Sequence, residues 1–323
     1  MMLNVKKIAV WGLGKHAISR ILPAIGEVNG LRLVGVCSRT ESVVKECAEN
    51  MNCRGWTDPD DMLQEQDLDI IYLATPIGLH AEQGKSILLA GKHLWCEKPF
   101  TCDLAQSEGL IKLSRTKELT VAEGFMYLYH MQFEEIRNKI RTDQLGRIKE
   151  VSLKFGFPLL ERPGFRYESR LCGGALWDVG SYSISAALNL FKNEAVVVKY
   201  VDLRDSKNHD VDFDGTVILD FSGGARVIST WHIGTGYKNE IDIWGEKGSV
   251  YSDKIFSKVE GYTPELRCRD KYGFETINTL ESMNQFVEMF NQFLLLLVSE
   301  NDAEQERKDI IQRARVMDEI AHY

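Results

Sequence analysis

Residues 7–17 read Lys-Ile-Ala-Val-Trp-Gly-Leu-Gly-Lys-His-Ala, and they decide the fold of the N-terminal part of the chain. An apolar run ends at Gly12, and a helical pattern follows through Ile18, Ile21, Leu22 and Ile25. A strand, a glycine turn and a helix in this order are typical of a unit that binds a dinucleotide. The first glycine permits the tight turn, the second lets the backbone approach a pyrophosphate, and the small Ala17 lets helix and strand pack closely.

Amides at the start of this helix would hold the phosphates, because a helix N-terminus favours negative charge. We therefore expect the turn to bind the cofactor through Gly12, Leu13, Gly14, Lys15, His16 and Ala17. The alternative is a chance match or a plain tight turn, since G-x-G-x-x-A by itself is a weak motif.

The end of the second expected strand, Leu31–Val36, carries the residues that choose between the two nicotinamide dinucleotides. About 20 residues after the fingerprint an acidic side chain usually binds the ribose 2′-hydroxyl of NAD. Here the sequence is Ser38-Arg39-Thr40. Arg39 can pair with a 2′-phosphate and the two hydroxyls can donate to it, which predicts a preference for NADP(H) over NAD(H). The alternative is that Ser38 caps the next helix, 41–50, and Arg39 is solvated.

Two further apolar runs, Leu68–Ala74 and Gly91–Cys96, end in polar residues. Helical patterns separate the runs, which indicates right-handed crossovers and a doubly wound parallel sheet with ligands beyond the carboxyl ends of its strands. At that edge we expect cofactor contacts from Thr75, Pro76, His80, Glu97 and Lys98. Lys98 is the first catalytic candidate, because it would lie beside the nicotinamide. For His80, ordering the loop is favoured over an acid role.

From residue 148 onward the pattern changes to strands without long helices between them. The expected strands are 148–157, 195–203, 211–221, 225–233 and 239–245. They predict a large open, mainly antiparallel sheet. The fold class is therefore α/β plus α+β, with an NADP-binding Rossmann domain over residues 1–125 and a substrate-binding and oligomerisation domain over residues 126–303. An open sheet leaves one face uncovered, so we expect a homodimer or homotetramer that assembles through it.

A second candidate site lies in the run Gly173–Ile184, which reads G-G-A-L-W-D-V-G-S-Y-S-I. Asp178 and Tyr182 are four residues apart, so on a helix they project from one face, where a carboxylate and a phenol can position a hydroxyl and pass a proton. From spacing alone, an N-capping aspartate and a core tyrosine are the favoured alternative. Upstream, Arg166 and Tyr167 could meet a substrate phosphate and stack on a ring, or be ordinary surface residues.

The composition argues against several classes of function. The 323 residues carry a formal net charge of -8 and no block of basic residues, which argues against a nucleic-acid partner. No apolar run is long enough to span a membrane, and the start of the chain leads directly into a strand, so we expect a cytoplasmic protein without a membrane partner. The seven cysteines include no C-x-x-C pair, and no metal site is expected.

The motifs G-L-G-K-H-A, T-P-I-G-L-H, E-K-P and G-G-A-L-W-D-V-G-S-Y-S-I, in this order, resemble the glucose-fructose oxidoreductase / inositol dehydrogenase / MocA (Gfo/Idh/MocA) family over nearly the whole chain. The resemblance implies that Lys98 polarises the reacting oxygen, Tyr182 exchanges the proton and Asp178 orients the substrate. It also implies that the last helix, 304–323, packs on the cofactor domain. The sequence departs from the family at Ile77, where an asparagine is frequent, so a ribose contact there is in doubt.

Tyrosine rather than histidine at position 182 is similar to the branches that include glucose-fructose oxidoreductase, dihydrodiol and xylose dehydrogenases, and nucleotide-sugar 3-ketoreductases. The run Phe165-Arg166-Tyr167, with Gly173–Leu176 and Ala186–Leu188, looks most like the last of these. The resemblance thus implies an NADP(H)-dependent enzyme that transfers a hydride between nicotinamide and a hydroxyl/keto group of a sugar or nucleotide sugar, which includes reduction of a 3-keto sugar. The alternatives are a dihydrodiol or free-sugar dehydrogenase and, in another class, a non-catalytic NADP-binding sensor.

The substitution Arg39→Ala tests the cofactor prediction. We expect the wild type to bind NADPH more tightly than NADH, and the variant to lose most of that preference, because the pair with the 2′-phosphate is gone. Fluorescence titrations of both proteins with both cofactors measure the four affinities. An unchanged preference in the variant would contradict the role given to Arg39.

Overall fold

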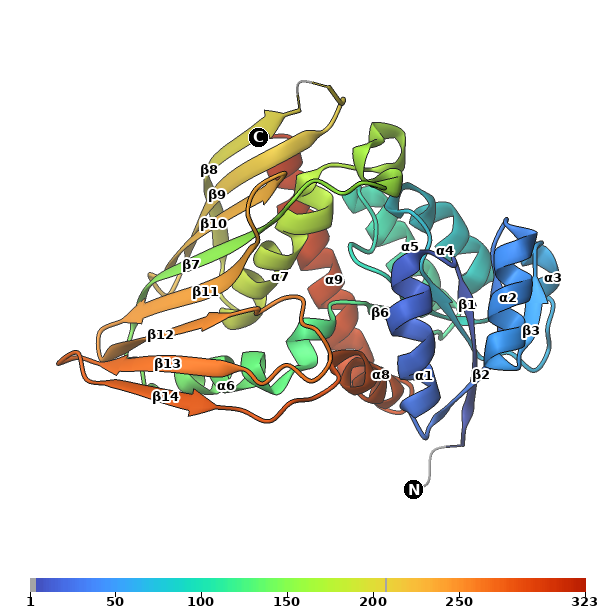
Figure 1. Cartoon of the computed structure of the whole chain (residues 1–323), viewed down its shortest axis with the longest axis horizontal. Coiled ribbons are helices and arrows are strands. Elements are labelled where there is room, and N and C mark those ends of the chain that lie inside the picture. The colour runs from blue at the N-terminus through green and yellow to red at the C-terminus, as the bar shows by residue number, and fades with distance from the viewer. Residues whose placement is uncertain (1–3, 207) are drawn as a thin grey trace. The chain divides into compact units, whose positions relative to one another are not determined.

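The computed structural model describes residues 4–206 and 208–323, which divide into two compact units. The first unit runs to Gly124 and also includes Phe286–Ala314, and the second comprises Phe125–Gln285 and Arg315–Tyr323. Figure 1 labels most of the helices and strands of both. Within the residues described, no helix has the length and apolar character that a membrane span needs.

The first unit is built on a six-stranded sheet with the order β3-β2-β1-β4-β5-β6, and every neighbouring pair is parallel. Its strands are β1 (Lys6–Trp11), β2 (Leu31–Cys37), β3 (Arg54–Trp56), β4 (Ile70–Leu73), β5 (His93–Cys96) and β6 (Val121–Glu123). The order reverses between β1 and β4, which is where doubly wound sheets bind ligands. The predicted parallel sheet is confirmed.

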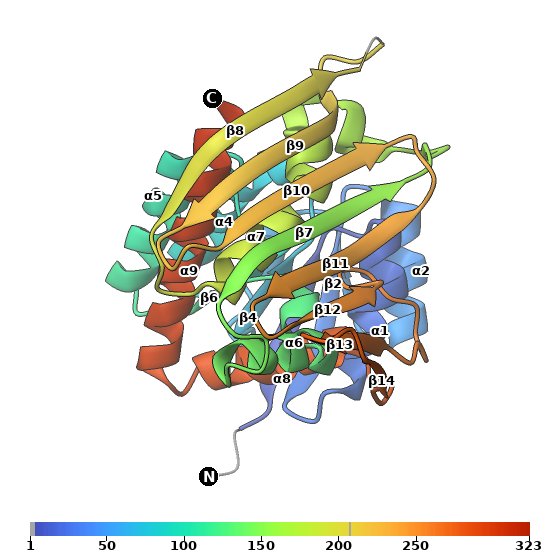
Figure 2. The same cartoon turned by 90° about the vertical axis from the view of Figure 1, so that its left-hand side faces the viewer.

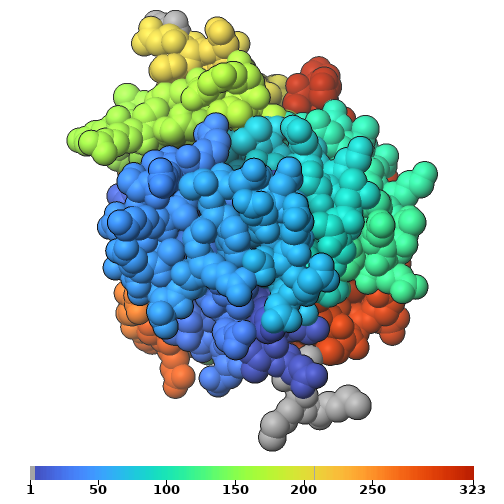
Figure 3. Space-filling model, turned by 90° about the vertical axis from the view of Figure 1, so that its right-hand side faces the viewer, coloured from blue at the N-terminus to red at the C-terminus, as the bar shows by residue number. Residues whose placement is uncertain are grey.

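The central strands of this sheet are apolar throughout because both of their faces are covered. All four residues of β4 are fully buried, as are Ile8, Ala9 and Val10 of β1. The helices of the unit are η1 (Ala17–Ile21), α1 (Leu22–Glu27), α2 (Glu41–Met51), α3 (Pro59–Leu63), η2 (Ile77–Leu79), α4 (His80–Leu89), α5 (Leu104–Thr116), α8 (Gln285–Leu296) and, up to Ala314, α9 (Glu300–Ala321). Figure 3 shows the surface of this unit, with its N-terminal half in blue and cyan across the middle of the view.

The second unit contains an eight-stranded sheet with the order β14-β13-β12-β11-β7-β10-β9-β8. Neighbouring strands are antiparallel except for β7 and β10, which are parallel, so the prediction of a mainly antiparallel sheet is confirmed. The strands are β7 (Ile148–Phe157), β8 (Val196–Asp205), β9 (Asp212–Phe221), β10 (Arg226–Ile233), β11 (Lys238–Gly245), β12 (Gly248–Asp253), β13 (Glu265–Asp270) and β14 (Glu275–Thr279).

One face of this sheet is covered by helices of the same unit, and the opposite face is turned toward the viewer in Figure 2. Buried and more exposed residues therefore alternate along β9, β10 and β11, as expected for a sheet with one covered face. The helices are η3 (Met126–Tyr129), α6 (Met131–Arg141), η4 (Gly164–Tyr167), η5 (Ser169–Leu171), η6 (Leu176–Gly180) and α7 (Ser181–Leu190).

Trp231 of β10 fixes how η6 packs on the sheet. Its indole is fully buried and fills the space left by two glycines. A Cβ on Gly215 would come within 2.2 Å of this indole, and a Cβ on Gly180, the last residue of η6, within 2.9 Å. Side chains at either glycine would therefore push η6 and the following helix α7 off the sheet.

Candidate active site

The glycine turn after β1 has the geometry that its sequence predicts. Gly12 adopts φ +109°, and a Cβ there would lie 2.5 Å from the backbone carbonyl of Ala74 in the neighbouring loop. Only glycine fits this conformation and this approach. A Cβ on Gly14, by contrast, would meet no atom within 4 Å, so the chain leaves room there for a ligand. The turn thus fits a dinucleotide pyrophosphate at the start of η1.

The segment that follows β2 places Ser38, Arg39 and Thr40 at the carboxyl end of that strand. Arg39 and Thr40 are exposed, and Ser38 is half-buried with its amide bonded to the Trp56 carbonyl. The N-cap residue of α2 is Thr40, so the alternative in which Ser38 caps this helix is wrong. The N-cap Thr40 has extended backbone, so the helix starts at Glu41, three residues beyond Ser38.

The loops after β4 and β5 are tied together by His80, the first residue of α4. Its ring is 1% exposed, with Nε2 2.9 Å from the Thr75 carbonyl oxygen and Nδ1 3.1 Å and 3.3 Å from those of Pro99 and Phe100. Burial lowers the pKa of His80, against the opposing effect of these carbonyls. These contacts order the loops that contain the Thr75-Pro76 and Lys98-Pro99 segments. A contact of His80 with the cofactor stays a prediction.

Glu97 joins the glycine turn, β4 and the lysine loop. Its Oε1 accepts a hydrogen bond from the Tyr72 hydroxyl at 2.6 Å and lies 3.2 Å from His16 Nε2, while its Oε2 accepts from the Lys98 amide at 3.3 Å. Burial alone would raise the pKa of Glu97, but His16, the Tyr72 hydroxyl and Lys98 together lower it to about 2. The carboxylate is therefore ionised and holds the backbone at Lys98. The Lys98-Pro99 peptide bond is cis, a point that the sequence leaves open.

The candidate cofactor residues of the first unit thus share one edge of the sheet. They follow β1, β2, β4 and β5, and the carboxyl ends of parallel strands lie on the same side. Hydrogen bonds and an ion pair bring His16, Glu97 and Lys98 together, and the His80 ring links Thr75 to Pro99. Thr75 also donates to the side chain of Gln83 at 2.5 Å.

The second unit contains the remaining candidates, on η6 and α7. Asp178 is 8% exposed, and its Oδ2 accepts a hydrogen bond from Arg166 Nε at 2.6 Å. Ala175 is the N-cap residue of η6, so the alternative that makes Asp178 an N-cap is wrong. Arg166 and Asp178 therefore form one charged group. Tyr167 instead packs against the tilted rings of His209 and Phe213, each with its ring centroid 4.8 Å away.

Tyr182 lies among aromatic side chains near the start of α7 and is 8% exposed. Its ring centroid is 5.4 to 5.9 Å from those of Phe125, Tyr127, Phe155 and Phe256. Its hydroxyl is 3.9 Å from the sulfur of Met126, a weak acceptor. This packing fixes the ring, and it is compatible with both a positioned proton donor and the core tyrosine that spacing favours.

Sequence reasoning missed Asp212, the first residue of β9. Its Oδ2 accepts a hydrogen bond from the Leu176 amide at 2.7 Å and so holds the start of η6. Burial raises the pKa of Asp212 to about 6. No signal in the sequence points to this residue, because its partner is far away in the chain. Within the part of the chain that the structure describes, no group of His, Cys, Asp and Glu side chains is placed to hold a metal ion.

Comparison with known proteins agrees with this geometry. The model of the Gfo/Idh/MocA oxidoreductase family with an NAD-binding Rossmann fold matches residues 6–125, and the GFO/IDH/MocA C-terminal domain matches residues 133–251. The chain belongs to the Gfo/Idh/MocA family. The resemblance expected from the sequence motifs is confirmed, and the protein is an oxidoreductase.

Individual members of the Gfo/Idh/MocA family match most of the chain. A dTDP-3,4-didehydro-2,6-dideoxy-alpha-D-glucose 3-reductase of Saccharopolyspora spinosa is 29% identical over 82% of this chain and 80% of its own length. A protein of the same name from Actinomadura kijaniata is 26% identical over 98% and 95%. The crystal structure of KijD10, a 3-ketoreductase from Actinomadura kijaniata in complex with NADP and TDP-benzene, has a TM-score of 0.93 and 25% identity, and covers 99% of this chain and 98% of that one.

The substitution Glu97→Gln tests the charge of the carboxylate that holds the lysine loop. Because the pKa of Glu97 falls from 4.5 to about 2 on folding, its charge stabilises the fold above pH 4.5, and this contribution is lost as the pH falls through about 2. At pH 7 we expect the variant to lose on the order of 3 kcal/mol of unfolding free energy.

Urea denaturation of the wild type and Glu97→Gln between pH 3 and pH 7 measures the difference in unfolding free energy. This pH range brackets the ordinary carboxyl pKa. The matched control is Glu108→Gln, on the exposed side of α5. If the loss of unfolding free energy in Glu97→Gln does not become smaller as the pH falls, the lowered pKa of Glu97 is contradicted.

Proposed function

We propose that this protein is an NADP(H)-dependent reductase of a keto group on a nucleotide sugar, with the 3-keto position as the target. The observation that carries the proposal is the Glu97-Lys98-Pro99 loop, which a buried carboxylate holds at the ligand-binding edge of a dinucleotide-binding sheet. Relatives named as dTDP-sugar 3-reductases, which match more than four fifths of the chain, support the substrate class.

The preference for NADP(H) rests on the segment after β2. In place of a carboxylate, which would repel a 2′-phosphate, the chain presents the exposed Arg39 between two hydroxyl side chains. A guanidinium can bind phosphate oxygens through two parallel hydrogen bonds. The presence of NADP in the KijD10 crystal structure supports the same assignment.

Bound NADPH supplies the hydride. Hydride transfer to the substrate carbonyl would leave negative charge on its oxygen, which the ammonium of Lys98 would stabilise. The hydroxyl of Tyr182 then donates a proton to the oxygen, which completes the alcohol. Asp178, held by Arg166, orients the substrate hydroxyls as a hydrogen-bond acceptor.

Arg166 and Tyr167 are the residues that we expect to bind the nucleotide part of the substrate. The guanidinium of Arg166 is half-buried and belongs to the same segment as the aromatic group of Tyr167, His209 and Phe213. A cation beside a group of aromatic rings suits a diphosphate and a base. A dihydrodiol or free-sugar dehydrogenase would need neither. A non-catalytic sensor would need the cofactor fold without Lys98 and Tyr182.

We further propose that two copies of the chain associate through the open face of the eight-stranded sheet. Trp244 is 66% exposed there and lines a cavity of about 490 Å³ together with Tyr251, Arg267 and Arg269. An exposed aromatic residue among paired charges is typical of a surface that a second copy covers.

Light scattering tests the assembly. We expect a mass twice the 36.8 kDa of one chain, and a shift toward one chain in Trp244→Glu, which would place a charge in the interface. Tyr272→Phe, on an exposed loop between β13 and β14, is the control. A wild type that has the mass of a single chain would contradict the proposal.

Lys98→Met and Tyr182→Phe test the reaction. With NADPH and a dTDP-linked 3-keto sugar we expect each variant to lose roughly 10² to 10⁴ in kcat, because each removes a group that acts on the reacting oxygen. Both should still bind NADPH. Initial rates of NADPH oxidation measure the effect, with the exposed Lys85→Met on α4 as the control.

The free keto sugar is the second substrate in these assays. We expect a much lower kcat/KM for it than for the nucleotide-linked form, since binding of the remote diphosphate contributes to catalysis. Equal values for the two substrates would favour a free-sugar dehydrogenase. NADPH binding without turnover of either substrate would favour a sensor.

A further inference from the structure

The helix α9 carries two buried arginines to which the proposed reaction assigns no role. Arg307 is 2% exposed and Arg313 is 7% exposed, although most residues of this helix are polar. A buried guanidinium is costly unless carboxylates or carbonyls satisfy it. The partners of each arginine therefore indicate what that arginine does in the first unit.

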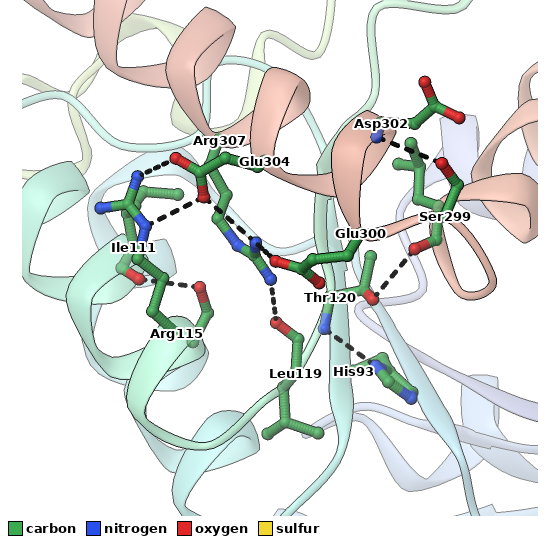
Figure 4. Close-up of polar contacts among 12 residues, drawn as sticks. His93, Ile111, Arg115, Leu119, Thr120, Ser299, Glu300, Asp302, Glu304 and Arg307 are labelled. Atoms are coloured by element: carbon green, nitrogen blue, oxygen red, sulfur yellow. Dashed lines mark hydrogen bonds and ion pairs between the residues drawn. The ribbon is translucent and has the colours of Figure 1, made fainter.

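Arg307 holds the N-terminal part of α9 against α5 and the turn before β6 (Figure 4). Its Nη1 donates to Glu300 at 2.6 Å and to Glu304 at 3.3 Å, and its Nη2 donates to the Leu119 carbonyl at 3.2 Å. Glu304 also accepts hydrogen bonds from Arg115 of α5, at 2.7 Å and 3.1 Å. These contacts attach the helix to the unit and do not involve the lysine loop.

Arg313, nearly two turns further along α9, contacts different partners. Its Nε donates to Glu123 Oε2 at 2.6 Å, and its Nη2 donates to Glu306 Oε1 at 3.0 Å. Glu123 is the last residue of β6, and its side chain is 3% exposed. The other oxygen of that carboxylate, Oε1, accepts a hydrogen bond from the amide of Phe100 at 2.7 Å. Glu123 thus connects the helix to the residue that follows Lys98-Pro99.

The charges in this cluster depend on one another. Burial by itself would lower the pKa of Arg313, but the carboxylates of Glu123 and Glu306 outweigh this effect and raise it, so the guanidinium stays charged. Burial raises the pKa of Glu306 to about 7 even though Arg313 opposes the shift. Without the guanidinium, the buried Glu123 carboxylate would lose its ion pair, which favours rearrangement of its side chain. The acceptor for the Phe100 amide would then be weakened.

The backbone at Lys98 is therefore held on both sides. On its N-terminal side Glu97 accepts from the Lys98 amide, and on its C-terminal side Glu123 accepts from the Phe100 amide. The Phe100 side chain is 2% exposed, which leaves this residue little freedom to move if its amide keeps its partner. Loss of the second contact would loosen the segment that follows Lys98, although His80 would still contact the Pro99 and Phe100 carbonyls.

We propose that Arg313 is a positioning residue: by holding the Glu123 carboxylate against the Phe100 amide, it fixes the backbone that carries Lys98. The inference rests on the role of Lys98 in the proposed function. Displacement of a catalytic group by about 1 Å can cost on the order of 10²-fold in rate. We expect the effect mainly on kcat, because most of the predicted cofactor contacts come from the glycine turn and the segment after β2, which are other loops of the unit.

The experiment compares Arg313→Met with Arg307→Met in the full-length protein. Both variants remove a buried guanidinium from the same helix and keep an apolar chain of similar length, so both are expected to lower the melting temperature. Arg307→Met controls for loss of stability alone. Arg313→Lys keeps the positive charge and serves as the conservative variant if Arg313→Met does not fold.

Hydrogen exchange, followed by mass spectrometry of peptides that cover Phe100, measures the loop without any reaction. We expect at least about tenfold faster exchange at the Phe100 amide in Arg313→Met than in the wild type, since this amide loses its acceptor. Exchange there should be unchanged in Arg307→Met and intermediate in Arg313→Lys. Equal exchange at Phe100 in the two methionine variants would overturn the proposal.

Steady-state kinetics provide the second readout. For Arg313→Met we expect kcat to fall by about 10- to 100-fold with the Kd of NADPH within a factor of about three, and for Arg307→Met we expect kcat to be retained. A fall of kcat that is the same in both variants would overturn the positioning role. A wild type without reductase activity would refute the proposed function instead, and the exchange measurement would still decide whether Arg313 orders the loop.

Discussion

The buried carboxylate of Glu97 is the interaction on which the first half of the site depends. It accepts from Tyr72 of β4 and from the Lys98 amide, and it lies beside His16 of the glycine turn. The glycine turn, β4 and the lysine loop, which are far apart in the sequence, therefore meet at one charge. Its ionisation is favoured by His16, Tyr72 and Lys98 strongly enough to overcome burial. The position of the lysine in such a site depends on hydrogen bonds to its backbone as well as on its side chain.

The second unit places Tyr182 mainly by packing, whereas Asp178 is held by its ion pair with Arg166. η6 packs closely on Trp231 because Gly180 and Gly215 lack side chains. The Asp212 carboxylate accepts a hydrogen bond from the amide at the start of η6. The position of Tyr182 on α7 then follows from the helix that precedes it. The two units hold their candidate residues in different ways. The first unit places a loop at the edge of a parallel sheet, and the second places a helix on the covered face of an open sheet.

Much of the fold could be predicted because burial leaves a pattern in the sequence. The strands β1, β4 and β5 are covered on both faces and read as apolar runs, and β9 to β11 alternate because one face is covered. The strands β12 to β14 were not predicted, since they are short and β14 is exposed throughout. Motifs identified the loops around Gly12 and Lys98 and the helix that carries Tyr182. The partners Asp212, Glu123 and Arg313 could not be identified, because their roles come from hydrogen bonds to distant segments that no local pattern records.

The most direct test of the central claim follows the hydride itself. The enzyme would be incubated with a dTDP-linked 3-keto sugar and NADPH that carries deuterium at both C4 positions, and the product would be analysed by mass spectrometry and NMR. We expect one deuterium in each product molecule, bound to the carbon that carried the keto group. A product that contains no deuterium, or recovery of the unreacted keto sugar, would contradict the assignment of this chain as an NADPH-dependent keto-sugar reductase.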